Sequence, residues 1–189
     1  SFKSINFKAS ARAGKWLVNV HDYTIQQKVT ILLNMDRANQ YYDMRLYENS
    51  IRMAASMANA YEQEGVPVSL WSNGRDVMTG ENIELEEGCG TGHLHTLFEN
   101  LARMEISLEV EDFAPFLQRA AEDTDANSMY LLISPFFGKN CVENFEELQK
   151  RHESAMWILP VVLSDLSDSD FKGQELADRL PNIYLWKVD

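Results

Sequence analysis

Two apolar runs constrain the fold of this chain more than any other feature. Val29 to Leu33 and Met129 to Ile133 are almost uninterrupted runs of apolar residues. Such runs are typical of strands covered on both faces, as in a parallel sheet that lies between two layers of helices. We therefore expect both segments to be central strands, with ligand-binding residues at their carboxyl ends, where open α/β sheets place their sites.

Helical patterns separate the predicted strands, which favours βαβ units. Apolar residues recur at spacings of three and four in four stretches, at residues 43–64, 93–103, 112–122 and 142–153. Residues 171–179 are expected to form a poorer helix, because they contain Gly173. Further strands are expected at residues 66–71, 156–163 and 183–188, and Pro160 predicts a bulge or an edge in one of them. The fold class is therefore α/β, with three layers and a mostly parallel sheet of about six strands.

Two shorter segments complete the prediction. Residues 72–76, with the sequence Ser-Asn-Gly-Arg-Asp, are interpreted as a turn, and residues 77–78 and 83–85 as a small hairpin. Before the first central strand, residues 4–12 are expected to form a short helix and residues 15–20 a strand near an edge.

Composition limits the partners. The length of 189 residues fits a single domain, and the net charge of −12 disfavours nucleic acid and anionic lipid. Two cysteines are too few for a disulfide framework, and no apolar run is long enough for a membrane helix. Because the chain begins at Ser1 rather than Met, we expect a longer parent protein.

The run from Ile5 to Arg12, followed by Gly14 and Leu17-Val18, carries a family signature. It resembles the Ile-Asn-Trp-Lys-Ala-Ser-Ala-Arg motif of bacterial domain-of-unknown-function family fifty-eight, with Phe7 in place of tryptophan. The resemblance implies a von Willebrand factor type A-like domain, in the cytoplasm, belonging to a membrane-anchored protein. It also implies a protein partner, in particular a MoxR-type AAA+ ATPase.

Type A domains often bind Mg²⁺ through an Asp-x-Ser-x-Ser loop after the first central strand, with a Thr and an Asp from neighbouring loops. The resemblance places this loop at residues 34–38, where Asn34, Asp36 and Ala38 replace the three ligands. Thr91 is the candidate for the threonine, and Pro135 falls at the later aspartate. We expect a degenerate loop without metal, with Mg²⁺ binding through Asp36 and Thr91 as the alternative.

A literal Asp-x-Ser-x-Ser occurs elsewhere, in a late loop. It comprises Asp165, Ser167 and Ser169, with Asp168 between them. Two interpretations stay open for this loop, a solvated acidic turn and a loose cation site.

Cys89, His93 and His95 lie within seven residues of one another. They allow a zinc site or a hydrolase in which His93 activates the Cys89 thiol, although the spacing matches no structural zinc pattern. The neighbouring Gly88, Gly90 and Gly92 offer backbone N–H groups to a phosphate, but the acidic residues before them oppose an anion. We expect no enzymatic activity and no cofactor.

Aromatic residues follow two of the predicted central strands. Together with polar residues of the degenerate loop they are predicted to form a contact patch for a protein partner, since aromatic residues and arginine are enriched at interface centres. The predicted contact residues are Asn34, Asp36, Arg37, Tyr41, Tyr42, Phe136 and Phe137. The other interpretation is that Tyr41 and Phe136 cap the core.

Overall fold

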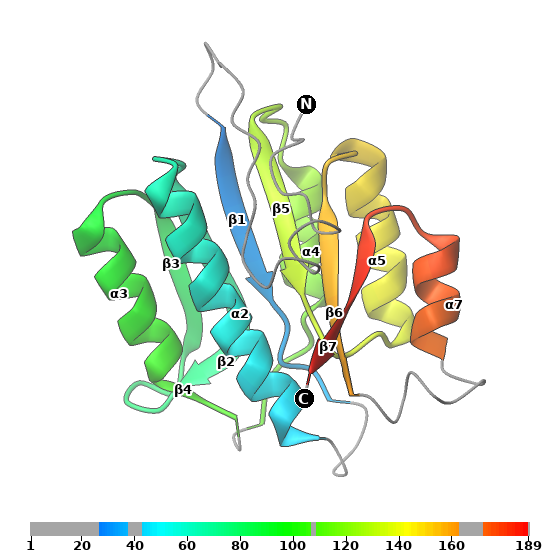
Figure 1. The fold of residues 1–189 in the computed structure, drawn as a ribbon, viewed down its shortest axis with the longest axis horizontal. Coiled ribbons are helices and arrows are strands. Elements are labelled where there is room, and N and C mark those ends of the chain that lie inside the picture. The colour runs from blue at the N-terminus through cyan, green and yellow to red at the C-terminus, as the bar shows by residue number, and fades with distance from the viewer. Residues whose placement is uncertain (1–26, 38–42, 107–108, 163–171, 189) are drawn as a thin grey trace.

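The computed structural model describes residues 27–37, 43–106, 109–162 and 172–188. A seven-stranded sheet runs through the middle of the molecule in the order β3-β2-β1-β5-β6-β7, and β4 pairs with β2 outside that path (Figure 1). The strands are β1 (Lys28–Leu33), β2 (Val68–Asp76), β3 (Asn82–Gly88), β4 (Met104–Glu105), β5 (Ser128–Ile133), β6 (Met156–Val162) and β7 (Ile183–Val188).

Five of these strands are parallel, and β3 and β4 run antiparallel to β2. The helices are α2 (Met44–Gln63), α3 (Thr91–Ala102), α4 (Ala114–Glu122), α5 (Lys139–Arg151) and α7 (Lys172–Arg179). The predicted α/β class and mostly parallel sheet are confirmed. The segments predicted at residues 4–12 and 15–20 lie outside the described residues.

The sheet separates two apolar cores. Val29, Ile31 and Leu33 of β1 pack with α2 and α3 on one face. Leu32 of β1 packs on the other face with α4, α5 and α7. Both faces of β1 are thus covered, which is the physical reason for its continuous apolar run.

The longest helix follows its sequence pattern closely. Asp43 caps α2, because its carboxylate accepts a hydrogen bond from the N–H of Arg45 at 3.0 Å. Tyr47, Ala54, Ala58 and Tyr61 form the buried part of the stripe that was expected from their spacing, whereas Met44 at its start is exposed.

The segment at residues 72–76 is not a turn, and this prediction is wrong. It continues β2 to Asp76, with an irregularity in the pairing with β3 between Ser72 and Arg75. Polar side chains are tolerated there because Ser72 Oγ donates to Leu33 O at 2.6 Å and accepts from Gly74 N at 2.9 Å. The chain turns at residues 77–81 instead, so β2 itself pairs with β3 in the hairpin.

Pro160 causes neither a bulge nor an edge. β6 lies between β5 and β7, and its register with β7 continues through Pro160 and Trp186. The last bond from β5 runs from Ser134 N to Ile158 O at 3.2 Å. The backbone polar groups of every second residue in β6 face β5, so the nitrogen of Pro160 faces the same side as the carbonyl of Ile158. β5 has ended before that level, so the missing N–H of Pro160 costs no hydrogen bond to β5.

Gly65 follows the C-terminal cap of α2, and its backbone conformation can be tested by substitution. Gly65 has a φ of +69° and a Cβ there would meet no atom within 4 Å. We predict that Gly65→Ala lowers the free energy of unfolding by about 1 kcal/mol in a urea titration, through backbone strain.

Gly92→Ala is the matched control, because Gly92 lies inside α3 and also has open space around it. It should be neutral or stabilising by up to about 1 kcal/mol. Equal losses in both variants would contradict the account.

Candidate functional site

The candidate site lies at the carboxyl edge of the sheet, where β1 ends. Residues 34–37 follow β1 directly. Asn73 reaches this loop from β2, and residues 109–113 approach it between β4 and α4. Three separate segments of the chain therefore meet at Asp36.

Asn73 holds these segments together. Its Oδ1 accepts a hydrogen bond from Met35 N at 2.9 Å. Its Nδ2 donates to Asp36 Oδ1 at 2.7 Å and to Glu111 O at 2.6 Å. The side chain is fully buried, so these partners replace the water that its amide would otherwise need.

Asp36 is the only carboxylate in the loop after β1. Its Oδ1 accepts from Asn73, its Oδ2 accepts from Phe113 N at 3.2 Å, and its backbone carbonyl accepts from the Tyr47 hydroxyl at 2.7 Å. Burial raises the pKa of Asp36 to about 6, and the charge of Asp112 adds to this rise, whereas the bonds from Phe113 N and Asn73 oppose it. Burial thus outweighs the hydrogen bonds that favour the charged form.

Asn34 lies deeper than Asp36 and is fully buried. Its Oδ1 accepts from Asp36 N at 2.8 Å, which closes a local turn. Its Nδ2 donates to the sulfur of Cys141 at 3.6 Å. Burial raises the pKa of the Cys141 thiol to about 12, so the sulfur is a neutral partner rather than a thiolate.

These donors and acceptors do not suit a magnesium ion. Mg²⁺ needs an octahedral shell of oxygen atoms, whereas Asn34 Oδ1 accepts from the backbone and an amide N–H points at Asp36 Oδ1. No group of three His, Cys, Asp or Glu side chains able to hold a metal occurs within residues 27–37, 43–106, 109–162 and 172–188.

The structure does not bring Thr91 to Asp36, so the alternative magnesium site that combined these two residues is not assembled. Gly88, three residues before Thr91, pairs with Val68 at the beginning of β2. Since β2 is parallel to β1, Thr91 lies at the amino edge of the sheet, one strand length from Asp36. The direction of β3 in the hairpin places it there. Asp165, Ser167 and Asp168 fall outside the described residues.

The predicted contact residues are only partly grouped by the structure. Phe136 and Phe137 are partly buried against the core formed with α4 and α5, which supports the core-capping interpretation for Phe136. A Cβ on Gly138 would lie 2.4 Å from the ring of Phe136. Arg37 is partly buried beside Asp36, and Tyr41 and Tyr42 lie outside the described residues.

Sequence reasoning missed three residues that shape the site. Asn73 was assigned to a turn, although its position five residues past the start of a strand could have shown that it reaches the edge. Tyr47 was counted only as part of the apolar stripe, and its hydroxyl gave no separate signal. Phe113 contributes through its backbone N–H, which no sequence pattern reveals.

His93 and His95, the two histidines near Cys89, are each held by a local partner. His93 Nε2 lies 2.7 Å from Val68 O and therefore donates to that carbonyl. Its ring lies against Gly88, where an added Cβ would approach Nδ1 to 2.4 Å. Cys89 is exposed, and exposed His95 lies 3.6 Å from Glu99. The two histidines thus have separate local partners.

The glycine segment does not leave its helix N-terminus open to a phosphate. Gly90 has a φ of +93° and begins α3 as its N-cap. Its N–H donates to Glu62 Oε2 of α2 at 2.8 Å. A carboxylate of the chain itself therefore lies at the helix N-terminus, where it complements the partial positive charge.

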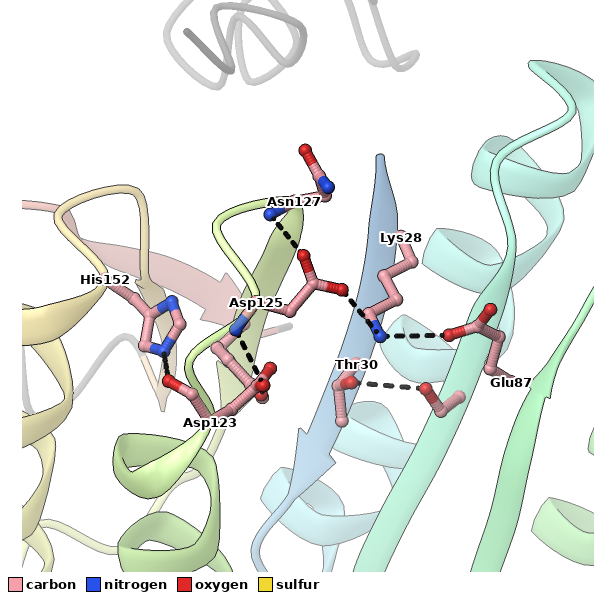
Figure 2. Close-up of polar contacts among 9 residues, drawn as sticks. Lys28, Thr30, Glu87, Asp123, Asp125, Asn127 and His152 are labelled. Carbon is pink, nitrogen blue, oxygen red and sulfur yellow. Dashed lines mark hydrogen bonds and ion pairs between the residues drawn. The ribbon is translucent and has the colours of Figure 1, made fainter. Parts of the chain in front are cut away.

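A second polar cluster lies at the amino edge of the sheet. Figure 2 shows Lys28 between Asp125 and Glu87, with Nζ to oxygen distances of 3.1 and 3.3 Å. Burial raises the pKa of nearby Asp123, but hydrogen bonds, including one from the Tyr130 hydroxyl at 2.7 Å, lower it to about 2 overall. The cluster ties β1 to β3 and to the loop before β5, and we assign it a structural role.

Comparison with solved structures supports the fold. The strand order and the helices on both faces define a von Willebrand factor type A-like fold. The pilus adhesin SpaC from Lactobacillus rhamnosus GG, in its open conformation, aligns with a TM-score of 0.55 and 11% identity over 89% of this chain. A second structure of that adhesin gives a TM-score of 0.56 at 10% identity, also over 89% of this chain.

The aligned region covers only 28% and 29% of the adhesin chains. The VWA domain of SpRpn10 aligns over 87% of this chain and 88% of its own, with 10% identity and a TM-score of 0.46. That score is too low to support an argument. No family model matches the sequence, and no curated protein matches it. The resemblance to domain-of-unknown-function family fifty-eight therefore stays a prediction.

The raised pKa of Asp36 gives a pH-dependent prediction. Its pKa rises from 3.8 to about 6 on folding, so the folded state binds more protons in that interval and loses stability as the pH rises through it. Between pH 4 and pH 7 the free energy of unfolding of the wild type should therefore fall by about 1–2 kcal/mol relative to that of Asp36→Asn. This loss is smaller than the full pKa shift would give, because the carboxylate is partly exposed.

Urea titrations of both proteins from pH 4 to 7 measure this difference. The readout is how the difference in unfolding free energy between the two proteins changes with pH. Its absolute value is not used, because the asparagine of the variant does not titrate and its hydrogen bonds are the same at every pH. A difference that stays constant over the interval would contradict the assigned environment of Asp36.

Proposed function

We propose that this chain is a protein-interaction domain that contacts its partner through the carboxyl edge of the sheet without a metal ion. The observation that supports this proposal is the bonding of Asp36, whose carboxylate oxygens accept from Asn73 Nδ2 and Phe113 N. These bonds hold Asp36 from within the protein. The described residues 34–37 are therefore positioned by neighbouring segments of the chain, as a preorganised contact surface requires.

The donor set explains why a cation is not needed to order this loop. A Mg²⁺ ion on Asp36 Oδ1 would compete with the Asn73 N–H that donates to that oxygen. The other N–H of the same amide donates to Glu111 O at 2.6 Å, so displacement of the amide would loosen residues 109–113 as well. Neutral Asn34 adds no charge that would offset this cost.

The partner and the parent protein are proposed from the family resemblance. We propose that the domain belongs to a membrane-anchored bacterial protein, lies on the cytoplasmic side, and acts with a MoxR-type AAA+ ATPase in assembling another complex. None of the helices in the described parts of the chain is long and apolar enough to cross a membrane. The contact would include Asp36 and Arg37.

We also propose that the domain is not an enzyme. The candidate nucleophile Cys89 is exposed, and the candidate base His93 donates to a backbone carbonyl. The purified domain should therefore show no hydrolase activity toward ester or peptide substrates. An activity that disappears in both Cys89→Ala and His93→Ala would contradict the proposal and assign the reaction to these two residues.

A thermal melt tests the metal-free site. We predict the same melting temperature in EDTA and in Mg²⁺ up to millimolar concentration, because the side-chain oxygens of Asn34 and Asp36 already accept hydrogen bonds. An ion at 100 times its dissociation constant would add about 2.7 kcal/mol, or several degrees for a domain of this size.

Asp36→Ala is the matched variant for this melt. A saturable Mg²⁺ shift that Asp36→Ala abolishes would overturn the proposal in favour of a cation-dependent ligand site. A shift that persists in Asp36→Ala but disappears in Asp165→Ala would assign the cation to the late acidic loop, which would leave the contact at Asp36 metal-free.

A further inference from the structure

The turn between β2 and β3 presents two exposed apolar side chains. Val77 is 55% exposed and Met78 is 78% exposed. The other large apolar side chains found exposed in the described residues are Met44 at 48%, Phe98 at 38% and Tyr184 at 36%. Because β2 is parallel to β1, this turn projects from the same edge of the sheet as Asp36.

Hydrogen bonds fix the backbone of this turn. Asp76 Oδ1 accepts from Met78 N at 2.7 Å, and Asp76 O accepts from Gly80 N at 2.8 Å. Asp76 N donates to Glu81 O at 3.0 Å, which closes the turn at its base. The backbone is therefore held in one conformation although Val77 and Met78 face solvent.

Two arginines attach the turn to the rest of the domain. Arg103 Nε lies 2.9 Å from Asp76 Oδ2, and Arg103 O accepts from Val77 N at 2.9 Å. Arg75 donates to Gly80 O at 2.7 Å and to Glu109 O at 3.0 Å. The turn is thus bonded to residues 109–113, the segment that also contacts Asp36.

The surroundings of the turn are acidic. Exposed carboxylates lie on the turn itself and on the segment beside it, namely Glu81, Glu109, Glu111 and Asp112. The two nearby arginines already have carboxylate partners, Glu111 at 3.2 Å for Arg75 and Asp76 for Arg103. The net charge of −12 for the whole chain has the same sign.

We infer that Val77 and Met78 form a preorganised anchor that packs against an apolar surface flanked by lysine or arginine on a protein partner. A rigid turn loses little conformational entropy on binding, and methionine adapts its shape to the surface it meets. Basic residues beside that surface would complement the exposed carboxylates of Glu81, Glu109 and Asp112. The inference rests on the proposed contact through the carboxyl edge, and it makes the hairpin turn the centre of that contact.

A short helical peptide with leucines on one face, flanked by lysines, is a suitable probe for this surface. A second peptide with glutamate in place of every lysine is its control. Fluorescence anisotropy with the full chain should show binding of the lysine peptide and binding at least about tenfold weaker for the glutamate peptide.

Met78→Ser should weaken binding of the lysine peptide at least about tenfold, as expected for a central apolar anchor. Phe98→Ser, an exposed apolar change on α3, should alter it by less than about twofold. Glu81→Gln with Glu109→Gln should reduce the salt dependence of binding. Thermal melts of each variant establish that the fold is retained.

Three results would overturn the inference: no binding of the lysine peptide, equal binding of both peptides, or binding that Met78→Ser leaves unchanged. Asp36→Ala separates this failure from failure of the proposed function. Loss of binding in Asp36→Ala but not in Met78→Ser would preserve a contact at the carboxyl edge and remove the anchor. Binding that neither substitution affects would contradict both.

Discussion

The structure depends on the pairing of β1 with parallel strands on both sides. Val29 aligns with Val68 of β2 and with Met129 of β5. This position satisfies the backbone of β1 within the sheet and covers both of its faces with helices. The end of β1 is consequently fixed, and Asp36 beyond it meets the side chain of Asn73 from β2 and the backbone N–H of Phe113 before α4.

The carboxyl edge is organised by a single buried amide. Asn73 contacts the backbone of the loop after β1, the carboxylate of Asp36 and the carbonyl of Glu111. Such an amide fixes three segments with neutral hydrogen bonds, where a cation would do so with charge. The hairpin turn extends this ordered surface, because Arg75 connects it to Glu109.

Sequence patterns predicted the elements better than their arrangement. The stripe of α2 and the apolar runs of β1 and β5 are local properties, and all three were located correctly. The bulged end of β2 was mistaken for a turn, because Asn73 and Gly74 favour turns unless distant residues provide partners. The alternative that joined Thr91 to Asp36 failed for a different reason. The antiparallel pairing of β3 with β2 carries Thr91 to the opposite edge of the sheet, and the local sequence does not encode that pairing.

The amide of Asn73, and not a cation, holds the carboxylate of Asp36 in place. The most direct measurement is an NMR titration with Mg²⁺ that follows the side-chain amide of Asn73 and the carboxyl carbon of Asp36. The account predicts that neither signal moves beyond the change caused by ionic strength in a matched salt. A saturable shift of both signals would contradict it, because an ion at Asp36 must displace the amide.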